Sequence, residues 1–270
     1  MSNTLTTSLH NHTTWSDGVS TITEMIEGSR RAGISELGIS DHFAVAPDGR
    51  RYDWSIRLDQ LDRYVAELQK AISATKDVTV RMGLEVDYFP ETIDAITRIV
   101  SNYNFDFLIG SVHFVGEFPT DFDAKYWKKL SQESHDEIWK GYWKRVRMMA
   151  ESGIFDFVGH FDVPKKYKYY PSIDLTEDAL AALDGIAAAD MAIEINTAGW
   201  DKPVQEAYPS LFYLQEAHRR KIPLIINADA HKADDVARNF DRARELARSA
   251  GYSSGVKYDK RKRIDIPLFS

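Results

Sequence analysis

IPLIINADAH at residues 222–231 joins an apolar run to a polar end. The apolar run over 223–228 is typical of a buried β-strand. Asp229 and His231 follow it at alternate positions, and the amphipathic pattern over 234–249 predicts a helix next. The basic unit of this chain is therefore a buried strand that ends in polar side chains and leads into a helix.

The same unit recurs along the whole chain. Strands are predicted at 5–10, 35–40, 78–86, 105–111, 155–159, 191–196 and 223–228. Helices are predicted at 20–33, 55–75, 91–101, 133–151, 175–189, 209–220 and 234–249. Regular alternation favours a parallel sheet, and the lack of a glycine-rich fingerprint after the first strand favours a closed barrel. We expect an α/β fold, a distorted (β/α)7 TIM-like barrel formed as one domain by residues 1–270.

Every predicted strand ends in a polar group. In chain order these groups are His10 and His12, His42, Glu85, His113, His160, Asn196, and Asp229 with His231. The carboxyl ends of barrel strands meet at one rim, so we expect these side chains to form a ring there. Imidazole mixed with carboxylate suits zinc, manganese or iron, and the chain has no cysteine. The sequence therefore predicts a polynuclear metal site with a hydrolytic role.

Each residue of this set also has a plainer interpretation. Taken alone, the His10-x-His12 spacing favours cross-strand packing over metal binding. Glu85 would otherwise need a partner such as Arg81. Asp17 could form the turn before Gly18 or cap the following helix. The joint occurrence of the motifs at successive strand ends favours metal.

The other two histidines serve as internal controls. His135 and His218 fall inside predicted helices rather than at strand ends. We expect ordinary surface or helix-packing roles for both.

Composition limits the partners. The 270 residues carry a formal net charge of −7 and 43% hydrophobic residues. An acidic chain is poorly suited to nonspecific binding of nucleic acid or anionic membranes. We expect a small substrate, and an anionic one would need local positive charge. The lack of cysteine, of a signal peptide and of a long apolar run favours a cytoplasmic protein.

Three segments lie outside the repeating pattern. The connections from Phe43 to Ser55 and from Phe114 to Glu133 are long and rich in aromatic and charged residues. Loops of this length are often lids or substrate-binding loops. The charged run DKRKRID at 259–265 is interpreted as a solvated end of the chain.

The motifs together resemble a known family. HNH followed by SDG, then SDH, GLEVD, GSVH, GH and NADAH are similar, in order and over nearly the whole chain, to the PHP (polymerase and histidinol phosphatase) superfamily. Within it, GSVHF, GHFDV, EINTAG and YPS at 208–210 most resemble the stand-alone histidinol-phosphate phosphatases of histidine biosynthesis. The resemblance implies a distorted seven-unit barrel with three divalent metal ions.

The resemblance also implies which residues hold each ion. The first ion takes His10, His12, Glu85 and Asp229; the second takes Glu85, His113 and His160; the third takes Asp17, His42 and His231. Glu85 would bridge the first two. Some relatives have a histidine near the position of Asp17, so the metal of the third site could differ. Zinc, manganese and iron all remain open.

The implied reaction is the hydrolysis of L-histidinol phosphate to L-histidinol and phosphate by a metal-activated hydroxide, without a phosphoenzyme. Phosphate needs further positive charge, for which Lys165, Lys166 and Lys202 follow ligand-bearing strands, although each could be a solvated loop lysine. Phe114, Phe118, Trp200 and Tyr208 are candidate walls for the imidazole of the substrate. Glu117 or Asp121 could meet its ammonium group.

Other functions stay open on the sequence. Relatives include phosphodiesterases and exonucleases, and a nucleotide phosphatase would use the same centre. Metal-dependent amidohydrolases also begin with HxH, but they typically place a modified lysine where this chain has His113. A structural metal module without catalysis is a further alternative, although all nine ligand positions are filled here. The oligomeric state is not indicated.

Overall fold

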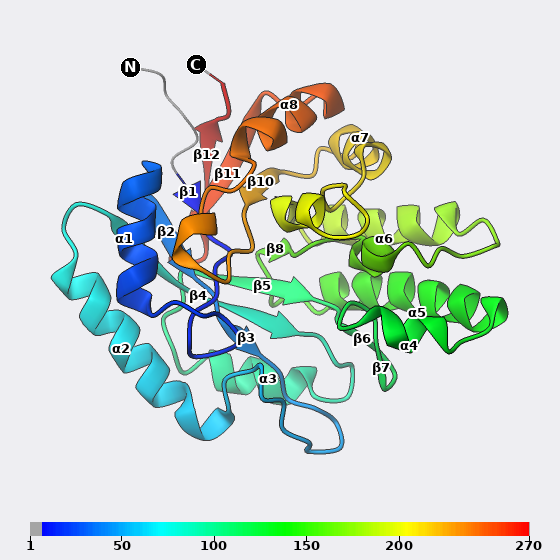
Figure 1. Cartoon of the computed structure of the whole chain (residues 1–270), viewed down its shortest axis with the longest axis horizontal. Coiled ribbons are helices and arrows are strands. Elements are labelled where there is room, and N and C mark those ends of the chain that lie inside the picture. The colour runs from blue at the N-terminus through cyan, green and yellow to red at the C-terminus, as the bar shows by residue number, and fades with distance from the viewer. Residues whose placement is uncertain (1–6, 270) are drawn as a thin grey trace.

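Seven parallel strands form the centre of the molecule. The computed structural model describes residues 7–269 (Figure 1). In sheet order the strands are β1 (Thr7–Ser8), β2 (Glu36–Ile39), β4 (Thr79–Asp87), β5 (Phe107–Ser111), β8 (Phe157–Val158), β9 (Ala192–Asn196) and β10 (Leu224–Asn227). A short strand, β3 (His42–Phe43), pairs with the end of β4 and places His42 opposite Glu85. All seven predicted strands are present, although residues 5 and 6 of the first lie outside the described residues.

The first and last strands meet just beyond their ends. Asn11 and Ala230 form a parallel bridge, and the backbone amide of His12 donates to the carbonyl of Ala230 at 2.8 Å. The sheet is therefore a nearly closed barrel. The predicted distorted seven-unit barrel is confirmed.

Helices follow the strands and cover the outside of the sheet (Figure 1). They are α1 (Ile22–Ala32), α2 (Leu61–Ala74), α3 (Ile93–Val100), α5 (Gln132–Glu151), α6 (Thr176–Ala188), α7 (Leu211–Arg219) and α8 (Phe240–Ala250). A short helix, α4 (Ala124–Lys128), and a hairpin of β6 (Phe114–Val115) and β7 (Phe118–Pro119) lie in the connection before α5. Four 3₁₀ turns complete the description: η1 (Leu58–Gln60), η2 (Val163–Tyr167), η3 (Thr197–Asp201) and η4 (Ala233–Asp235).

Local signals explain the ends of α1. Thr21 caps the helix and forms a capping box with Glu24, while Gly33 ends it with a φ of 72°. Asp17 is therefore not the cap, and that interpretation of Asp17 was wrong. Its side chain is free to turn toward the barrel.

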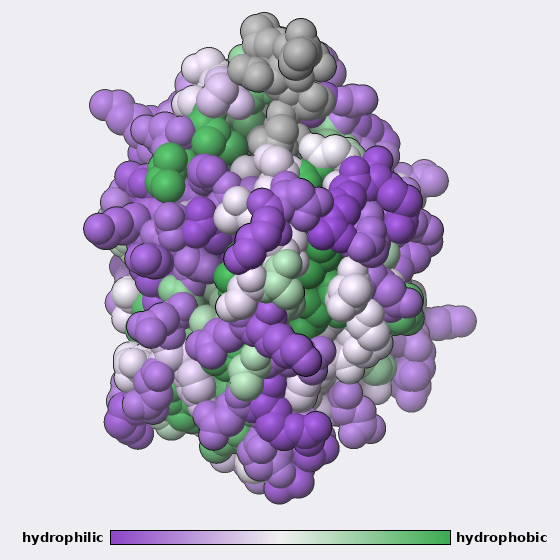
Figure 2. Space-filling view, turned by 90° about the vertical axis from the view of Figure 1, so that its left-hand side faces the viewer, coloured by the Kyte–Doolittle hydropathy of each residue, from purple (hydrophilic) through white to green (hydrophobic). Residues whose placement is uncertain are grey.

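The outer surface is mostly polar. Figure 2 shows that the face over α1 and α2 is largely hydrophilic, with small scattered hydrophobic areas. Among residues 7–269, no helix has both the length and the apolar character needed to cross a bilayer.

Alternate residues of the strands fill the barrel interior. They are apolar toward the amino ends of the strands and polar toward the carboxyl ends. On β5, Phe107 and Ile109 lie in a buried cluster inside the barrel, while Ser111 reaches Glu85 at 2.6 Å. A Cβ on Gly83 would lie 2.3 Å from the ring of Phe107, so only glycine leaves room for that ring. The apolar lower layer supports a polar layer at the carboxyl ends of the strands.

A C-terminal hairpin closes the lower end. β11 (Ser254–Asp259) and β12 (Lys262–Pro267) pair antiparallel, and Val256 and Tyr258 join the buried cluster inside the barrel. Residues 259–265 are solvated as predicted, since most of their side chains are exposed. They are also paired, because they form the end of β11, the turn and most of β12, and Arg261 contacts Asp156 at 2.6 Å.

Asp156 makes the stability of this end depend on pH. Its carboxylate accepts the backbone amide of Leu108 at 2.7 Å, and burial raises its pKa to about 6. Because this value lies above the unfolded one, the Asp156 contribution to stability is largest below about pH 4 and is lost as the pH rises through 6. Relative to Asp156→Asn, the parent should lose up to about 3 kcal/mol of unfolding free energy between pH 4 and 7.

Denaturant unfolding of both proteins at several pH values measures this difference. Asp190→Asn, which changes an exposed carboxylate paired with Arg263 of the same hairpin, is the control and should follow the parent. Identical pH profiles for the parent and Asp156→Asn would show that Asp156 is not a titrating group of the folded state.

Candidate metal centre

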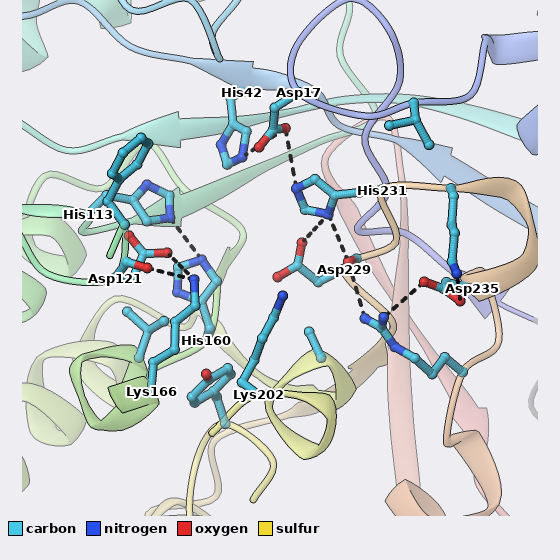
Figure 3. Close-up of a pocket in the computed structure, with 17 residues that line it drawn as sticks. Asp17, His42, His113, Asp121, His160, Lys166, Lys202, Asp229, His231 and Asp235 are labelled. Carbon is cyan, nitrogen blue, oxygen red and sulfur yellow. Dashed lines mark hydrogen bonds and ion pairs between the residues drawn. The ribbon is translucent and has the colours of Figure 1, made fainter. Parts of the chain in front are cut away.

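The nine predicted ligands lie together at the carboxyl ends of the strands. Figure 3 shows His42, His113, His160, Asp229, His231 and Asp17 turned toward one pocket. Glu85 on β4, together with His10 and His12, lies beneath them and is buried. Because these residues come from strands far apart in the sequence, the barrel itself assembles the group.

Glu85 is the centre of the group. Its Oε2 atom lies 3.3 Å from Nε2 of His10, 3.5 Å from Nε2 of His12 and 2.7 Å from Nδ1 of His42. The alternative in which Glu85 pairs with Arg81 was wrong, because Arg81 instead pairs with Glu36 at the opposite end of the barrel, at 2.6 Å.

The first predicted ligand set is compact. Oδ1 of Asp229 lies 3.2 Å from Nε2 of His12 and 3.7 Å from Nε2 of His10. Together with Oε2 of Glu85, these atoms enclose one small volume that is shielded from solvent.

The second set lies on the other side of Glu85. Its Oε1 atom is 2.8 Å from Nε2 of His160 and 3.7 Å from Nε2 of His113, and the two imidazole nitrogens are 3.1 Å apart. His160 has a φ of 24°, an unusual backbone conformation for a residue with a side chain. Such strain is common where a side chain must be held in a functional position.

The third set is more open. Oδ1 of Asp17 lies 3.3 Å from Nε2 of His231 and 3.6 Å from Nε2 of His42. His12 also lies close enough to share this group, and His42 is close enough to join Glu85 and His113 in the second. The structure thus holds several neighbouring His and carboxylate clusters suited to multiple metal ions.

The atoms fit the spacing that a metal requires. Two ligands of a tetrahedral zinc, each about 2.1 Å from the ion, lie about 3.4 Å apart. Three buried atoms, Nε2 of His10, Nε2 of His12 and Oε2 of Glu85, have no hydrogen-bond partner in the part of the chain that the structure describes. Buried polar atoms without a partner are costly, and a cation among them removes that cost.

Electrostatics also favour a cation. Burial lowers the pKa of the His113 imidazole, but Asp87, Asp121 and Glu85 outweigh burial and raise it to about 10. Burial opposes protonation of His231 as well, yet Asp17 and Asp229 raise its pKa to about 9. The carboxylates therefore create a field that attracts either protons or metal ions.

Metal binding should consequently compete with protons. At neutral pH, His113 and His231 hold protons that a bound metal must displace, so the apparent affinity should rise about tenfold per pH unit for each proton released. Calorimetric titration with Zn²⁺ in buffers of different ionisation enthalpy, between pH 6 and 8, measures the number released. His231→Ala should reduce that number and His218→Ala should not. An affinity independent of pH contradicts this prediction.

The remaining two histidines behave as predicted. Nε2 of His135 lies 3.0 Å from the carbonyl of Trp127, and the ring of His218 packs edge-on against Tyr252 with centroids 4.9 Å apart. Neither lines the pocket. Both have packing roles.

Buried carboxylates behind the ligands were missed by the sequence reasoning. Asp87 accepts from Nδ1 of His113 at 3.0 Å, and Asp41 accepts from the backbone amide of Thr13 at 2.6 Å and from the Ser16 hydroxyl at 2.6 Å. Both carboxylates occur in or directly after apolar strand patterns. The argument applied to Glu85, that a buried carboxylate needs a partner, could have identified them.

A pocket of about 490 Å³ opens above the ligands. Lys166 and Lys202 line it as predicted, and in Figure 3 the ammonium group of Lys202 points into its middle. Lys165 does not line it; its ammonium is buried and bound by Asp162 at 3.0 Å and Glu206 at 2.7 Å. The adjacent residues 165 and 166 point to opposite sides of η2, which spacing after His160 could not reveal.

Further charged residues line this pocket. Lys232 and Arg238 line it but were missed, because Lys232 lies between His231 and the predicted helix 234–249 and Arg238 lies within that helix, neither in a distinctive motif. The carboxylate of Asp121 lies 3.2 Å from the Lys166 ammonium, and Figure 3 shows the two side chains next to each other at one side of the pocket. Glu117 is largely exposed beside Arg50 and does not line the pocket.

Of the aromatic residues proposed as walls of the substrate site, some line a pocket and others do not. Tyr208 lines the main pocket, and Phe114 lines an adjoining one of about 90 Å³ with Trp54. Trp200 is buried beneath Arg242, whose guanidinium lies 4.4 Å from the ring, and Phe118 packs edge-on against Trp127. Neither lines either pocket. Trp54, which sequence reasoning missed, lies within the predicted lid connection from Phe43 to Ser55.

The sequence is similar to those of known proteins. Residues 8–198 match the family described as PHP domain. A probable histidinol-phosphatase from Deinococcus radiodurans is 34% identical over 231 residues, covering 84% of this chain and 86% of that protein. The histidinol-phosphatase of Bacillus subtilis is 27% identical over 243 residues, covering 82% and 91%.

A solved structure shares the fold. The histidinol phosphate phosphatase from Lactococcus lactis, crystallised with zinc, L-histidinol and phosphate, superimposes with a TM-score of 0.79 at 20% identity, over 96% of this chain and 98% of that one. The predicted family resemblance is confirmed by the match to 8–198 and by the relative at 34% identity. The chain therefore belongs to the PHP domain family.

Proposed function

We propose that this chain hydrolyses L-histidinol phosphate to L-histidinol and phosphate at a centre of divalent metal ions. The convergence of eight imidazole and carboxylate side chains around Glu85, beneath a pocket lined by lysines, carries the proposal. Relatives named histidinol-phosphatase, similar over more than four fifths of this chain, support it. The zinc, L-histidinol and phosphate of the Lactococcus lactis protein support the same substrate.

The nine side chains would hold the ions in the three sets described above. When bound, such ions lower the pKa of water and neutralise the charge on phosphoryl oxygens, which is the chemistry that a phosphomonoester requires. Zinc, manganese and iron all suit ligands of this kind. The chain's own residues must then bind the phosphate, orient the leaving alcohol and exclude other substrates.

The lysines bind the phosphate in this proposal. No hydrogen bond or ion pair within the described residues holds the ammonium of Lys202, so it is available to a phosphate oxygen. Burial and the nearby charge of Lys166 lower the pKa of Lys202, and an incoming dianion offsets both effects. Burial and the charge of Asp121 raise the pKa of Tyr208, so its hydroxyl stays protonated and can donate to phosphate.

The leaving group faces the aromatic side of the pocket. Trp54 and Phe114 lie nearly parallel, with centroids 6.3 Å apart, in the smaller pocket that shares His42, His113 and Asp121 with the main one. Aromatic walls with a carboxylate at their edge suit a flat, cationic alcohol. Lys165 and Trp200 have no place in this site.

Replacing Lys202 tests the phosphate contact. Lys202→Ala should raise KM for the phosphate ester and the inhibition constant for inorganic phosphate by about 10- to 100-fold each, because a charged hydrogen bond is lost. Steady-state kinetics with phosphate as inhibitor measures both. Lys144→Ala, on the exposed side of α5, should match the parent. An unchanged inhibition constant for phosphate in Lys202→Ala would show that Lys202 does not bind the phosphate.

The proposed substrate is tested by direct comparison. Phosphate release is measured from L-histidinol phosphate, from nucleoside monophosphates and from a single-stranded oligonucleotide with a terminal phosphate, using the metal-loaded chain. We expect kcat/KM for L-histidinol phosphate to exceed the others by at least about 100-fold. His113→Ala should be inactive and His218→Ala active. A preference for the oligonucleotide or a nucleotide overturns the proposal.

A further inference from the structure

One buried carboxylate behind the metal ligands faces four hydrogen-bond donors. Glu194 on β9 has no exposed surface. Its Oε1 atom lies 2.8 Å from Nδ1 of His10 and accepts Nδ2 of Asn227 at 2.9 Å. Its Oε2 atom accepts the backbone amide of His160 at 2.9 Å and Nδ2 of Asn196 at 3.1 Å. Each oxygen therefore serves two donors.

These contacts join three ligand-bearing segments. Glu194 holds the ring of His10 after β1 and the backbone of His160 after β8, at the residue whose φ is 24°. Glu194 is also connected to Asp229, the ligand after β10. The connection runs through Asn196, whose Nδ2 atom lies 3.0 Å from Oδ2 of Asp229. Glu194 therefore links ligands that follow three different strands of the barrel.

The contact with His10 also fixes a tautomer. A carboxylate only accepts, so Nδ1 of His10 must carry the proton that points to Glu194. Nε2 then presents its lone pair toward Oε2 of Glu85, 3.3 Å away, and it is one of the buried atoms without a hydrogen-bond partner. Histidine ligands of metals are commonly oriented by a carboxylate in this way.

We propose that Glu194 is a positioning residue, which holds His10, His160 and Asp229 in the arrangement that binds the metal ions tightly. The inference rests on the proposed metal-dependent function and adds a residue that does not touch metal or substrate. It requires an acceptor at both oxygens. Glutamine keeps the shape but turns an NH₂ group toward two of the four donors, so it cannot replace glutamate here.

Metal affinity tests the inference without reference to activity. Zn²⁺ is titrated into the full chain in competition with a chromophoric chelator, and the absorption spectrum of the Co²⁺-loaded chain is recorded. Glu194→Gln should weaken the tightest Zn²⁺ site by about 10- to 100-fold and change the Co²⁺ spectrum. The matched control is Asp156→Asn, which removes a carboxylate directly before β8, the strand that leads to His160, but contacts no ligand. It should bind both metals like the parent.

A second variant covers the case in which Glu194→Gln does not fold. Glu194→Asp keeps two accepting oxygens but withdraws them by one methylene, and it should also lose Zn²⁺ affinity. Parent-like affinity and spectrum in whichever variant folds overturn the inference. This failure is distinct from failure of the proposed function, in which the unsubstituted chain itself would bind no divalent metal or release no phosphate.

Discussion

Replacing Glu85 with glutamine is expected to lower kcat/KM for L-histidinol phosphate by at least about 10³-fold. Glu85 contacts the rings of His42 at 2.7 Å and His160 at 2.8 Å, and its two oxygens face different ligand sets. A neutral amide can neither bridge two cations nor balance their charge. Elemental analysis should show fewer ions per chain, since both sets that share this carboxylate are weakened.

The same Asp156→Asn variant provides the control for Glu85→Gln. Both changes replace a buried carboxylate by its amide, but Asp156 lies at the opposite end of the barrel beside Arg261. Asp156→Asn should keep parental kcat/KM and metal content. Full activity in Glu85→Gln would show that Glu85 does not bridge two ions. It would also contradict the proposed arrangement of the first two ions.

Removal of the metal ions is expected to lower the rate of hydrolysis by at least about 10³-fold and to lower Tm by about 5 °C or more. Among the described residues that line the pocket, the lysines can bind phosphate but cannot replace the ions in activating water. Stability falls because buried atoms of His10, His12 and Glu85 lose the cation that satisfies them. Dialysis against a chelator, followed by activity and thermal unfolding measurements, tests both effects.

Adding metal ions back to the chelator-treated chain shows whether their removal caused the loss of activity and of Tm. Zinc, manganese or iron should restore activity and Tm, whereas calcium should restore neither, because it prefers a shell of oxygen ligands. Glu85→Gln treated in the same way should regain little. Activity that persists when elemental analysis finds less than about 0.1 ion per chain would exclude metal-dependent hydrolysis.

The barrel could be predicted because each strand carries its own signal. Apolar runs such as LIIN on β10 and AIEIN on β9 are short, buried and followed by amphipathic helices. The convergence of the nine candidate side chains could be predicted for a related reason: parallel strands bring their carboxyl ends to one rim, where polar residues directly after the strands meet. His135 and His218 were excluded by the same rule.

Side-chain direction beyond the strand ends could not be predicted. Lys165 and Lys166 are neighbours, yet one is bound by Asp162 and Glu206 away from the pocket while the other lines it. Their directions depend on the path of η2 after His160. Trp200 was placed wrongly for the same reason, because η3 turns it into the core.

Contacts between distant strands also could not be predicted from the sequence. Glu194 meets His10 across 184 residues, and only the register of β9 and β10 with the end of β1 brings them together. The pairing of the charged run 259–265 in a hairpin could not be predicted, because it depends on Val256 and Tyr258, which anchor the preceding strand inside the barrel. The charged strand β12 itself stays largely exposed.

Elemental analysis combined with anomalous diffraction from crystals of the metal-loaded chain tests the central claim, that this rim is a polynuclear metal centre. We predict anomalous peaks on both sides of Glu85, one among His10, His12 and Asp229 and one between His113 and His160, with a third beside Asp17, His42 and His231. Fewer than two ions near His10 and His113 would contradict the account.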